Sequence, residues 1–563
     1  MTFEIRQVTY MQTEAKSFAT WSARGQHDTI ASMLRDRADR TPDAVFLEVE
    51  GAPALTYAAV HRRALELAGG LEKLGVRRGG RVATLMDTRP DTAILWFACA
   101  YIGAVYMPMN TALRGVFLEH QLRISETFVL FVDRGHLDAV RGIDGDVRAR
   151  LSAVVLADAE PGDELADVEL VTMETLDAEG REHPASVVHP GLWNEHAMIL
   201  FTSGTTGPSK GVILSHQFVV NMAMLYKRSM QIGPDDVFYS GLPLFHLSGS
   251  VITLLAPLVS GARGVLDKTF SVSGFWRRVK EVGATHTLLL GAMTQMLWQR
   301  TPDEYEQDNP LRAVTAVPIT AEMWHQFEAR FGVKIVTGYG ISETGQIMFS
   351  SVDHQAQPGT SGRPVAGYDF VIVDDNDEPL PPGEPGELLV RPRRPHLLFE
   401  GYCGDPDATL RILRNFWLHT GDICSIDAEG NFRFHDRKKD YLRRRGENIS
   451  SYEVEQAIMQ LPDVLDVAVI GVPSELGEDE VKACIVLREG ANVTEESILR
   501  ACVPLMPYFA VPRFIAFYEA LPRNAVGRVQ KFTLRDEHKQ RLGWDREVAG
   551  IKVTRTSAAE LGC

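Results

Sequence analysis

Short apolar runs separated by longer mixed stretches recur through the first two-thirds of the chain. Four of these runs begin at Arg81, Phe128, Ser152 and Thr285. Each has the length of a buried strand, and helix-like stretches lie between them, so the pattern predicts alternating strands and helices packed in layers. We therefore expect an α/β fold, with a large multi-layered N-terminal domain that contains mixed sheets.

One stretch of this region could be mistaken for a membrane span. Residues 92 to 109 carry no charged side chain and approach the length of a transmembrane helix. Gly103 and Pro108 interrupt the stretch, and the residues after the glycine resemble a strand. We expect a buried helix, a turn and a buried strand here, and no membrane span.

The pattern changes after Tyr368, where strand-like runs are joined by tight turns. The acidic turn at 374 to 379 resembles part of a calcium loop but lacks that loop's later Glu, so a solvated hairpin is the better interpretation. A compact stretch follows from 451, with a helix and then strands at 467–471 and 483–487.

A basic run at 437 to 446 separates these two parts of the chain. Most charge runs are solvated surfaces, but this one lies where the composition changes. We place a domain boundary here, between a large domain of residues 1–437 and a small, mobile α+β domain of residues 438–563.

Length, charge and cysteine content narrow the class of protein. A chain of 563 residues is too long for one core and predicts at least two domains. The net charge of −16 argues against a nucleic-acid-binding protein. The six cysteines are scattered without a CxxC pair, and the N-terminus lacks an apolar signal core, so we expect a cytoplasmic protein.

The most informative segment follows the apolar run at 197 to 201. Residues 202 to 212 read Thr-Ser-Gly-Thr-Thr-Gly-Pro-Ser-Lys-Gly-Val. Glycines let backbone N–H groups approach an anion, the hydroxyls add donors, and Lys210 adds a positive charge, which together suit a polyphosphate. The loop is not a Walker A motif, because Ser209 precedes the lysine and Gly211 follows it. A flexible linker would seldom follow a buried strand directly.

This loop resembles the phosphate loop of the adenylate-forming superfamily, which contains acyl-CoA synthetases, aryl-CoA ligases and adenylation domains. Further segments are similar in the same order, from about residue 30 to about residue 540. The resemblance implies that ATP binds to the loop and that Lys210 is catalytic. The loop residues concerned are Thr202, Ser203, Gly204, Thr205, Thr206 and Gly207.

Two further segments resemble the family's nucleotide site. Within residues 338 to 344, the resemblance implies that Tyr339 stacks on adenine, Ser342 meets the α-phosphate and Glu343 holds Mg²⁺, beside Gly338 and Gly340. Taken alone, Tyr339 would be interpreted as an aromatic residue packed at a strand end. In residues 417 to 423, Asp422 would hold the ribose hydroxyls together with Arg437. The adenine would lie near Ala316, Val317 and Pro318.

Two apolar segments resemble the walls of the family's carboxylate pocket. The first places His246 and Leu247 at the pocket, where His246 would line or gate it, although a lone His in an apolar run is more often a core residue. The second contributes Gly291 and Ala292.

The last matching segment departs from the family pattern. Most members have a catalytic Lys where this chain has Arg528, and Lys531 follows three positions later. Arg and Lys differ in shape and reach, so either residue could contact the substrate during adenylation, or the first half-reaction differs. Lys439 falls at the family's hinge, and Gly446, Glu447 and Asn448 would border the CoA tunnel.

We therefore predict an ATP-dependent acyl- or aryl-CoA ligase that forms an acyl-AMP and then a thioester, with ATP, Mg²⁺ and CoA as cofactors and a small carboxylic acid as substrate. The nearest resemblance is to bacterial ligases of the crotonobetaine/carnitine type. The alternatives are an enzyme that passes its acyl group to a carrier protein or another nucleophile, and a relative whose catalysis is altered at Arg528. Relatives are often homodimers.

Overall fold

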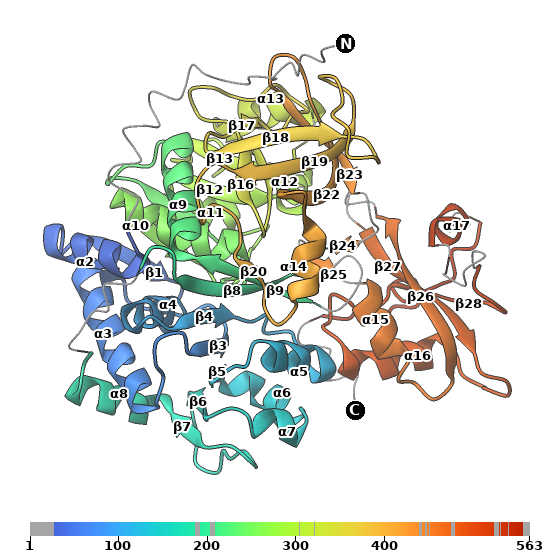
Figure 1. Ribbon diagram of the computed structural model, residues 1–563, viewed down its shortest axis with the longest axis horizontal. Coiled ribbons are helices and arrows are strands. Elements are labelled where there is room, and N and C mark those ends of the chain that lie inside the picture. The colour runs from blue at the N-terminus through green and yellow to red at the C-terminus, as the bar shows by residue number, and fades with distance from the viewer. Residues whose placement is uncertain are drawn as a thin grey trace.

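Two bodies of unequal size make up the computed structural model (Figure 1). The first two-thirds and more of the chain form a large α/β body, and the C-terminal part forms a smaller body of strands and helices at its side, as the sequence predicted. The structure describes the residues 28–185, 192–202, 209–302, 304–319, 321–437, 442–444, 447–449, 451–474, 479–522, 529, 531–538 and 540–554.

One sheet of the large domain has eight strands in the order β20-β9-β8-β4-β3-β5-β6-β7. Strands β3 to β8 pair in parallel, whereas β9 and β20 add antiparallel strands at one edge, so the sheet is mixed. The runs predicted from Arg81, Phe128 and Ser152 are three of these strands. Their bounds are β3 (Arg81–Leu85), β4 (Val105–Pro108), β5 (Val129–Asp133), β6 (Ala153–Ala157), β7 (Leu170–Thr172), β8 (His196–Thr202), β9 (Lys210–Ser215) and β20 (Gly401–Tyr402).

A second sheet of seven strands has the order β14-β13-β12-β10-β11-β1-β2. All of its pairs are parallel except the one between β1 and β2. The run predicted from Thr285 is β12. The bounds are β1 (Val45–Val49), β2 (Leu55–Thr56), β10 (Val237–Ser240), β11 (Arg263–Leu266), β12 (His286–Leu290), β13 (Ala313–Val317) and β14 (Lys334–Val336).

The main hydrophobic core lies between these two sheets. It contains Phe46 and Phe238 from the second sheet, Leu200 from the first, and Trp96 from a helix between them. The helices of the large domain are α2 (Ile30–Arg40), α3 (Tyr57–Lys73), α4 (Pro90–Ile102), α5 (Gly115–Ile124), η1 (Arg134–His136), α6 (Leu137–Arg141), α7 (Gly145–Arg148), α8 (Met173–Glu182), α9 (His216–Met230), η2 (Ser248–Leu255), α10 (Ala256–Ser260), α11 (Phe275–Val282), α12 (Gly291–Gln299), α13 (Ala321–Phe331) and α14 (Pro406–Ile412).

The uncharged stretch at 92 to 109 is a buried helix, a turn and a buried strand, which confirms the prediction. Every residue of α4 from Thr92 to Ile102 is buried, Gly103 ends the helix with φ of 67°, and β4 is buried throughout. Within the described part of the chain, no helix combines the length and the apolar character that crossing a bilayer requires.

Two antiparallel sheets complete the large domain. The predicted hairpin after Tyr368 is present, and Asp374 Oδ1 accepts the Asn376 and Glu378 N–H groups at 2.8 and 3.0 Å inside its turn. The bounds are β15 (Gly338–Ile341), β16 (Gly345–Phe349) and β17 (Arg363–Pro364) in one sheet, and β18 (Tyr368–Val373), β19 (Gly386–Pro392), β21 (Leu413–Arg414), β22 (Trp417–Ile426) and β23 (Phe432–Arg437) in the other.

The small domain contains a hairpin and a four-stranded sheet with helices beside it. The helix predicted near Ser451 is α15. A cluster of buried apolar residues continues from Leu113 and Phe117 of the large domain to Met506 and Phe509 of the small one, so the two domains are packed together. The bounds are β24 (Leu442–Arg444), β25 (Glu447–Ile449), α15 (Ser451–Ile458), β26 (Val464–Pro473), β27 (Asp479–Leu487), α16 (Glu495–Cys502), η3 (Val503–Leu505), β28 (Phe514–Phe517), α17 (Lys531–Asp536) and β29 (Trp544–Asp545).

Candidate functional site

The carboxyl ends of parallel strands in the second sheet bring together segments that are far apart in the sequence. Strands β10, β12, β13 and β14 are neighbours and run in the same direction, so the residues that follow them meet at one edge. His246 and Leu247 follow β10, Gly291 and Ala292 begin α12 after β12, and residues 316 to 318 span the end of β13. Gly291 lies so close to this last segment that a Cβ on it would be 2.9 Å from Pro318 Cδ.

The predicted phosphate loop connects two antiparallel strands of the first sheet. Thr202 ends β8 and pairs directly with Lys210, the first residue of β9. At the end of the loop, the Ser209 carbonyl lies 2.8 Å from His120 Nε2, and its hydroxyl accepts a hydrogen bond from Gln121 Nε2 at 3.3 Å. The loop residues Ser203, Gly204, Thr205, Thr206 and Gly207 lie outside the described residues.

Tyr402 connects Lys210 to Glu343. The Tyr402 hydroxyl donates a hydrogen bond to Glu343 Oε1 at 2.6 Å. On the same ring, Lys210 Nζ lies over the face, 4.8 Å from the centroid. Two residues that the sequence assigned to catalysis, from different sheets, therefore meet at one aromatic side chain.

The segment that contains Glu343 runs close to its neighbouring strand. Gly338 and Gly340 lie on β15, and Cβ atoms on them would collide with Phe349 and with the Gly345 carbonyl on β16. Only glycine allows this close approach. Ser342 and Glu343 follow in the turn between the two strands and are partly exposed.

Tyr339 and Asp422 are joined by a buried hydrogen bond. The Tyr339 hydroxyl donates to Asp422 Oδ2 at 2.7 Å, and the Tyr339 ring packs against Phe432 and Phe434. Burial and then the charge of Asp422 raise the pKa of Tyr339 well above its usual value, so the hydroxyl remains a donor. Asp422 on β22 is the register partner of Arg437 on β23, so the two residues predicted to hold a ribose lie opposite each other.

A cavity of about 110 Å³ lies where the two domains meet. The large domain contributes the end of β8, Ser209, the 245–247 segment and Ser342 to its lining, and the small domain contributes Glu447, Ile449 and the 507–510 segment. Across the cavity, His246 Nε2 lies 3.1 Å from Glu447 Oε2. His246 is therefore a cavity residue and not a core residue, and the predicted Glu447 reaches it from the small domain.

Lys531 does not join this group. Its ammonium group contacts Glu455 Oε1 at 2.6 Å and Ser451 Oγ at 2.7 Å, both on α15 of the small domain. Of the other small-domain predictions, Asn448 lies on β25 beside Glu447, whereas Lys439, Gly446 and Arg528 lie outside the described residues. Their roles stay predictions.

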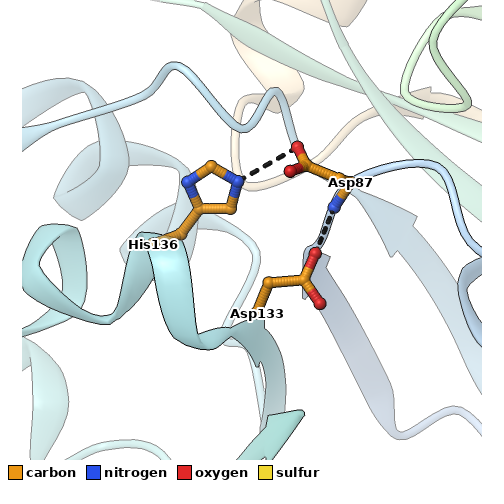
Figure 2. A group of neighbouring side chains, drawn as sticks. All are labelled: Asp87, Asp133 and His136. Atoms are coloured by element: carbon orange, nitrogen blue, oxygen red, sulfur yellow. Dashed lines mark hydrogen bonds and ion pairs between the residues drawn. The ribbon is translucent and has the colours of Figure 1, made fainter. Parts of the chain in front are cut away.

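A second polar group lies at the carboxyl ends of β3 and β5 in the first sheet. Figure 2 shows His136 pointing to Asp87, with Nε2 3.1 Å from Asp87 Oδ1, and Asp133 accepting the Asp87 backbone N–H at 2.6 Å. Arg89 donates to Asp133 Oδ1 at 3.0 Å and so places a positive charge in the group. These contacts join the ends of the two strands, and we assign the group a structural role.

Sequence reasoning missed Tyr402 and the 507–510 segment. The only local signal for Tyr402 is an aromatic residue after Gly401, which does not indicate that its hydroxyl reaches Glu343. Pro507, Phe509 and Ala510 line the cavity from a part of the small domain with no motif-like composition. Both contacts depend on how distant segments pack.

Comparison with known proteins agrees with this arrangement. The chain matches the AMP-binding enzyme family over residues 34–403 and the C-terminal domain of AMP-binding enzymes over residues 453–528. A crotonobetaine/carnitine–CoA ligase from Salmonella arizonae is 33% identical over 524 residues, which cover 91% of this chain and 99% of that protein.

Two solved structures extend the comparison to three dimensions. ATP-bound MatB from Rhodopseudomonas palustris is 25% identical, with a TM-score of 0.64 over 90% of this chain and 99% of that one. An o-succinylbenzoate CoA synthetase from Bacillus subtilis, bound to a product analogue, is 23% identical, with a TM-score of 0.76 over 91% of this chain and 98% of that one.

Proposed function

This chain belongs to the AMP-binding enzyme family and is an ATP-dependent acid–thiol ligase, and from this premise we propose how its residues divide the work. The enzyme activates a carboxylic acid as an acyl-AMP, releases pyrophosphate, and then transfers the acyl group to CoA. We propose that the large domain carries the first half-reaction and that the small domain, by changing its position, serves both.

The contact of Lys210 and Glu343 with Tyr402 is the observation that carries the first part of the proposal. A carboxylate is a poor electrophile, and its attack on the α-phosphorus builds negative charge on phosphoryl oxygens. Lys210 supplies a fixed positive charge at the end of the phosphate loop, where donors are most effective because they are already in place. Backbone N–H groups of Thr202 to Gly207 would supply further donors.

Glu343 fits the requirements of a magnesium ligand. Its carboxylate lies partly exposed beside Lys210, where the phosphates are expected, and Mg²⁺ in such sites takes one or two carboxylates together with phosphate oxygens. When bound, the ion would neutralise charge on the triphosphate. We propose no other magnesium ligand from the protein.

The nucleoside is proposed to lie along the edge of β15. Asp422, with Arg437 opposite it, would accept the ribose hydroxyls, and Tyr339 holds the Asp422 carboxylate through its hydroxyl. Adenine would lie between Tyr339 and the 316–318 segment, and Ser342 would contact the α-phosphate.

The second half-reaction is proposed to take place at the cavity between the domains. Glu447 from the small domain meets His246 from the large domain there, and Gly446 and Asn448 would complete the CoA tunnel.

Adenylation would then require the small domain to rotate. Lys531 is tied to Ser451 and Glu455 inside the small domain, so it could reach the carboxylate only after a swing about a hinge, for which we propose Lys439. We place the boundary between the two moving bodies after Arg437. Arg528, which replaces the family's Lys, is proposed to be the residue that the swing delivers.

The acid is proposed to be a small carboxylic acid that contacts His246, Leu247, Gly291 and Ala292. The relative from Salmonella arizonae is named for crotonobetaine and carnitine, so both belong in a substrate panel. Phe245 lines the same cavity, and an aromatic face attracts a quaternary ammonium group.

A panel of carboxylic acids tests the function. Each acid is incubated with ATP and Mg²⁺, with and without CoA, and read by pyrophosphate exchange and by the mass of the product. We expect exchange without CoA and a thioester with CoA for at least one acid, and no exchange in excess EDTA. An acyl-AMP that accumulates and never yields a thioester would indicate another acceptor, such as a carrier protein.

Paired variants separate the two candidates for the catalytic cation. We expect Arg528→Ala to slow pyrophosphate exchange strongly and to leave thioester formation from supplied acyl-AMP nearly unchanged, whereas Lys531→Met should affect exchange much less. The reverse ranking would assign the role to Lys531.

Lys439→Pro tests the proposed hinge. It should spare adenylation and block thioester formation, and loss of both activities would argue against a simple hinge.

A further inference from the structure

Tyr402 contacts both charged residues on which the proposed adenylation depends. Its hydroxyl donates to Glu343 Oε1 at 2.6 Å, and its ring lies under Lys210 Nζ at 4.8 Å from the centroid. Glu343 thus contacts the hydroxyl of Tyr402, and Lys210 contacts the face of its ring.

The position of Tyr402 is tightly determined by the strand that begins with Lys210. Tyr402 on β20 pairs with Val212 on β9, and the following Cys403 N–H donates to the Gly211 carbonyl at 2.7 Å. The Tyr402 N–H donates to Thr409 Oγ1 at 2.8 Å. These hydrogen bonds fix the Tyr402 ring relative to the start of β9, because its pairing partner Val212 is only two residues after Lys210.

The other side of the contact is equally constrained. The Glu343 carbonyl accepts the Phe399 N–H at 2.9 Å, and Phe399 packs edge-on against the Tyr402 ring at 5.0 Å between centroids. Tyr402 is 7% exposed, so water competes little for its hydroxyl. The segment from Phe399 to Cys403 consequently connects the Glu343 turn to the β8–β9 hairpin.

These contacts have a definite electrostatic effect. A hydroxyl that donates to a carboxylate fixes the direction of its oxygens. An aromatic face attracts an ammonium group and holds it without neutralising its charge. A carboxylate partner, in contrast, would neutralise that charge. One tyrosine can therefore keep the cation and the metal-binding carboxylate a ring's width apart, each with its charge available to the triphosphate.

We propose that Tyr402 is a positioning residue for adenylation, which orients Glu343 toward the metal–triphosphate and holds Lys210 beside it. The proposal rests on the roles assigned to Lys210 and Glu343 in the proposed function. It concerns the first half-reaction, because the second one no longer involves the triphosphate.

Tyr402→Phe tests the hydroxyl separately from the ring. The variant keeps the packing against Phe399 and the face under Lys210 and removes only the donor to Glu343. We expect the affinity for Mn²⁺·ATP, measured by calorimetry and by the electron paramagnetic resonance of Mn²⁺, to fall roughly tenfold, as for loss of a hydrogen bond to a charged group. The Mg²⁺ concentration for half-maximal pyrophosphate exchange should rise by a similar factor, and ATP binding without metal should change little.

A double-mutant cycle shows whether the effect passes through Glu343. Tyr402→Phe in a Glu343→Gln background should cost almost nothing further in Mn²⁺·ATP affinity, because the carboxylate that it orients is already gone. Tyr402→Leu, which also removes the ring, should weaken ATP binding even without metal, through Lys210. Tyr368→Phe is the matched control, since it removes another buried hydroxyl, the donor to the Leu397 carbonyl at 2.9 Å.

The proposal is overturned if Tyr402→Phe binds Mn²⁺·ATP as tightly as the unmodified chain. It is also overturned if the affinity losses of Tyr402→Phe and Glu343→Gln are fully additive in the double variant, or if Tyr368→Phe loses as much affinity as Tyr402→Phe. These outcomes differ from failure of the proposed function. If the unmodified chain exchanges pyrophosphate with no acid in the panel, the function is wrong, whereas the metal–nucleotide titrations still decide the role of Tyr402.

Discussion

The two domains hold their functional residues in different ways. In the large domain, two contacts join predicted nucleotide-site residues from different elements: Tyr402 on β20 contacts both Lys210 and Glu343, and Tyr339 on β15 donates to Asp422 on β22. The small domain presents Glu447 on a two-stranded hairpin, where Oε2 lies 3.1 Å from His246 Nε2, and it also lines the cavity with Ile449 and the 507–510 segment. A site for one half-reaction can be built permanently, whereas a group that serves only the other one must be able to leave.

The hairpin of the small domain has its own internal support. Arg444 on β24 is 2% exposed, and its Nε lies 2.7 Å from Glu480 Oε2 on β27. Its Nη1 donates to the Phe509 and Val511 carbonyls at 2.8 and 3.2 Å. Arg444 thus ties the hairpin to the same 507–510 segment that lines the cavity, so the small domain moves its contribution as one piece.

Among these predictions, loss of the Arg444 contacts should have the largest effect, which is on the stability of the small domain. Arg444→Met leaves buried Glu480 without its nearer cation, since Arg513 Nη1 lies 3.9 Å away, and breaking a buried ion pair typically costs about 3–5 kcal/mol of stability. Hydrogen exchange in the intact chain should rise in peptides that cover 447–449 and 507–511, and thioester formation should be lost while pyrophosphate exchange persists. The double variant Arg444→Met/Glu480→Leu should recover much of the stability, because no charge is left buried. Equal protection in the single variant and the unmodified chain would contradict the prediction.

The next largest effect should come from the large domain. Lys210→Met should slow pyrophosphate exchange by about 10²–10³, as for loss of one preorganised donor, with little effect on thioester formation from supplied acyl-AMP. Lys280→Met, at an exposed position of α11, is the control for loss of a lysine. A similar slowing of both half-reactions would remove the distinction between the domains.

Acid should weaken the large domain through His216. This first residue of α9 is 1% exposed, and burial lowers its pKa to about 4. The unfolded chain therefore binds a proton more readily than the folded one between about pH 6.5 and pH 4, so the free energy of unfolding falls as the pH falls through this range. Between pH 7 and pH 5 the loss from this group is about 2 kcal/mol. Urea titrations of His216→Gln, followed by tryptophan fluorescence, should show a shallower pH dependence, and an unchanged one would refute the assignment.

The smallest effect should come from the contact between the domains. His246 and Glu447 are 34% and 15% exposed at their side chains, so solvent weakens their attraction to about 1 kcal/mol or less. Glu447→Gln should slow thioester formation from acyl-AMP by roughly fivefold at most and leave adenylation unchanged. The pair His325–Glu328 on α13, in which the histidine is exposed, offers a control. A loss of a hundredfold would mean that Glu447 does more than hold the domain in place.

Much of the fold was readable from the sequence because its signals are local. Buried strands such as β3, β5 and β6 are short apolar runs, and Gly103 marks the end of α4 in a stretch that might have been a membrane span. In the acidic stretch that follows Ala157, the sequence predicted neither β7, which pairs with β6, nor α8, which packs on α3. Its apolar positions are too few to reveal a strand and helix that draw their stability from neighbours.

Some features of the candidate site were predictable from the sequence, and others were not. Residue types in sequence order predicted roles for the phosphate loop, Glu343 and Asp422, because each belongs to a contiguous motif, and these roles stay predictions. Neither the Tyr402 contact nor the Arg444–Glu480 pair could be predicted, since each joins segments whose approach depends on the packing of several strands.

The sequence alone determined which reactive groups this protein has available: hydroxyls, a lysine and glycines in one loop, and the carboxylates of Glu343 and Asp422 in two other motifs. Only the tertiary structure decided which of these groups meet, because strand register and packing place residues hundreds of positions apart within hydrogen-bonding distance. The tertiary structure also placed Glu447, rather than Lys531, at the boundary between the domains. The orientation of the small domain decides which of its sides faces the cavity, and no sequence motif specifies that orientation.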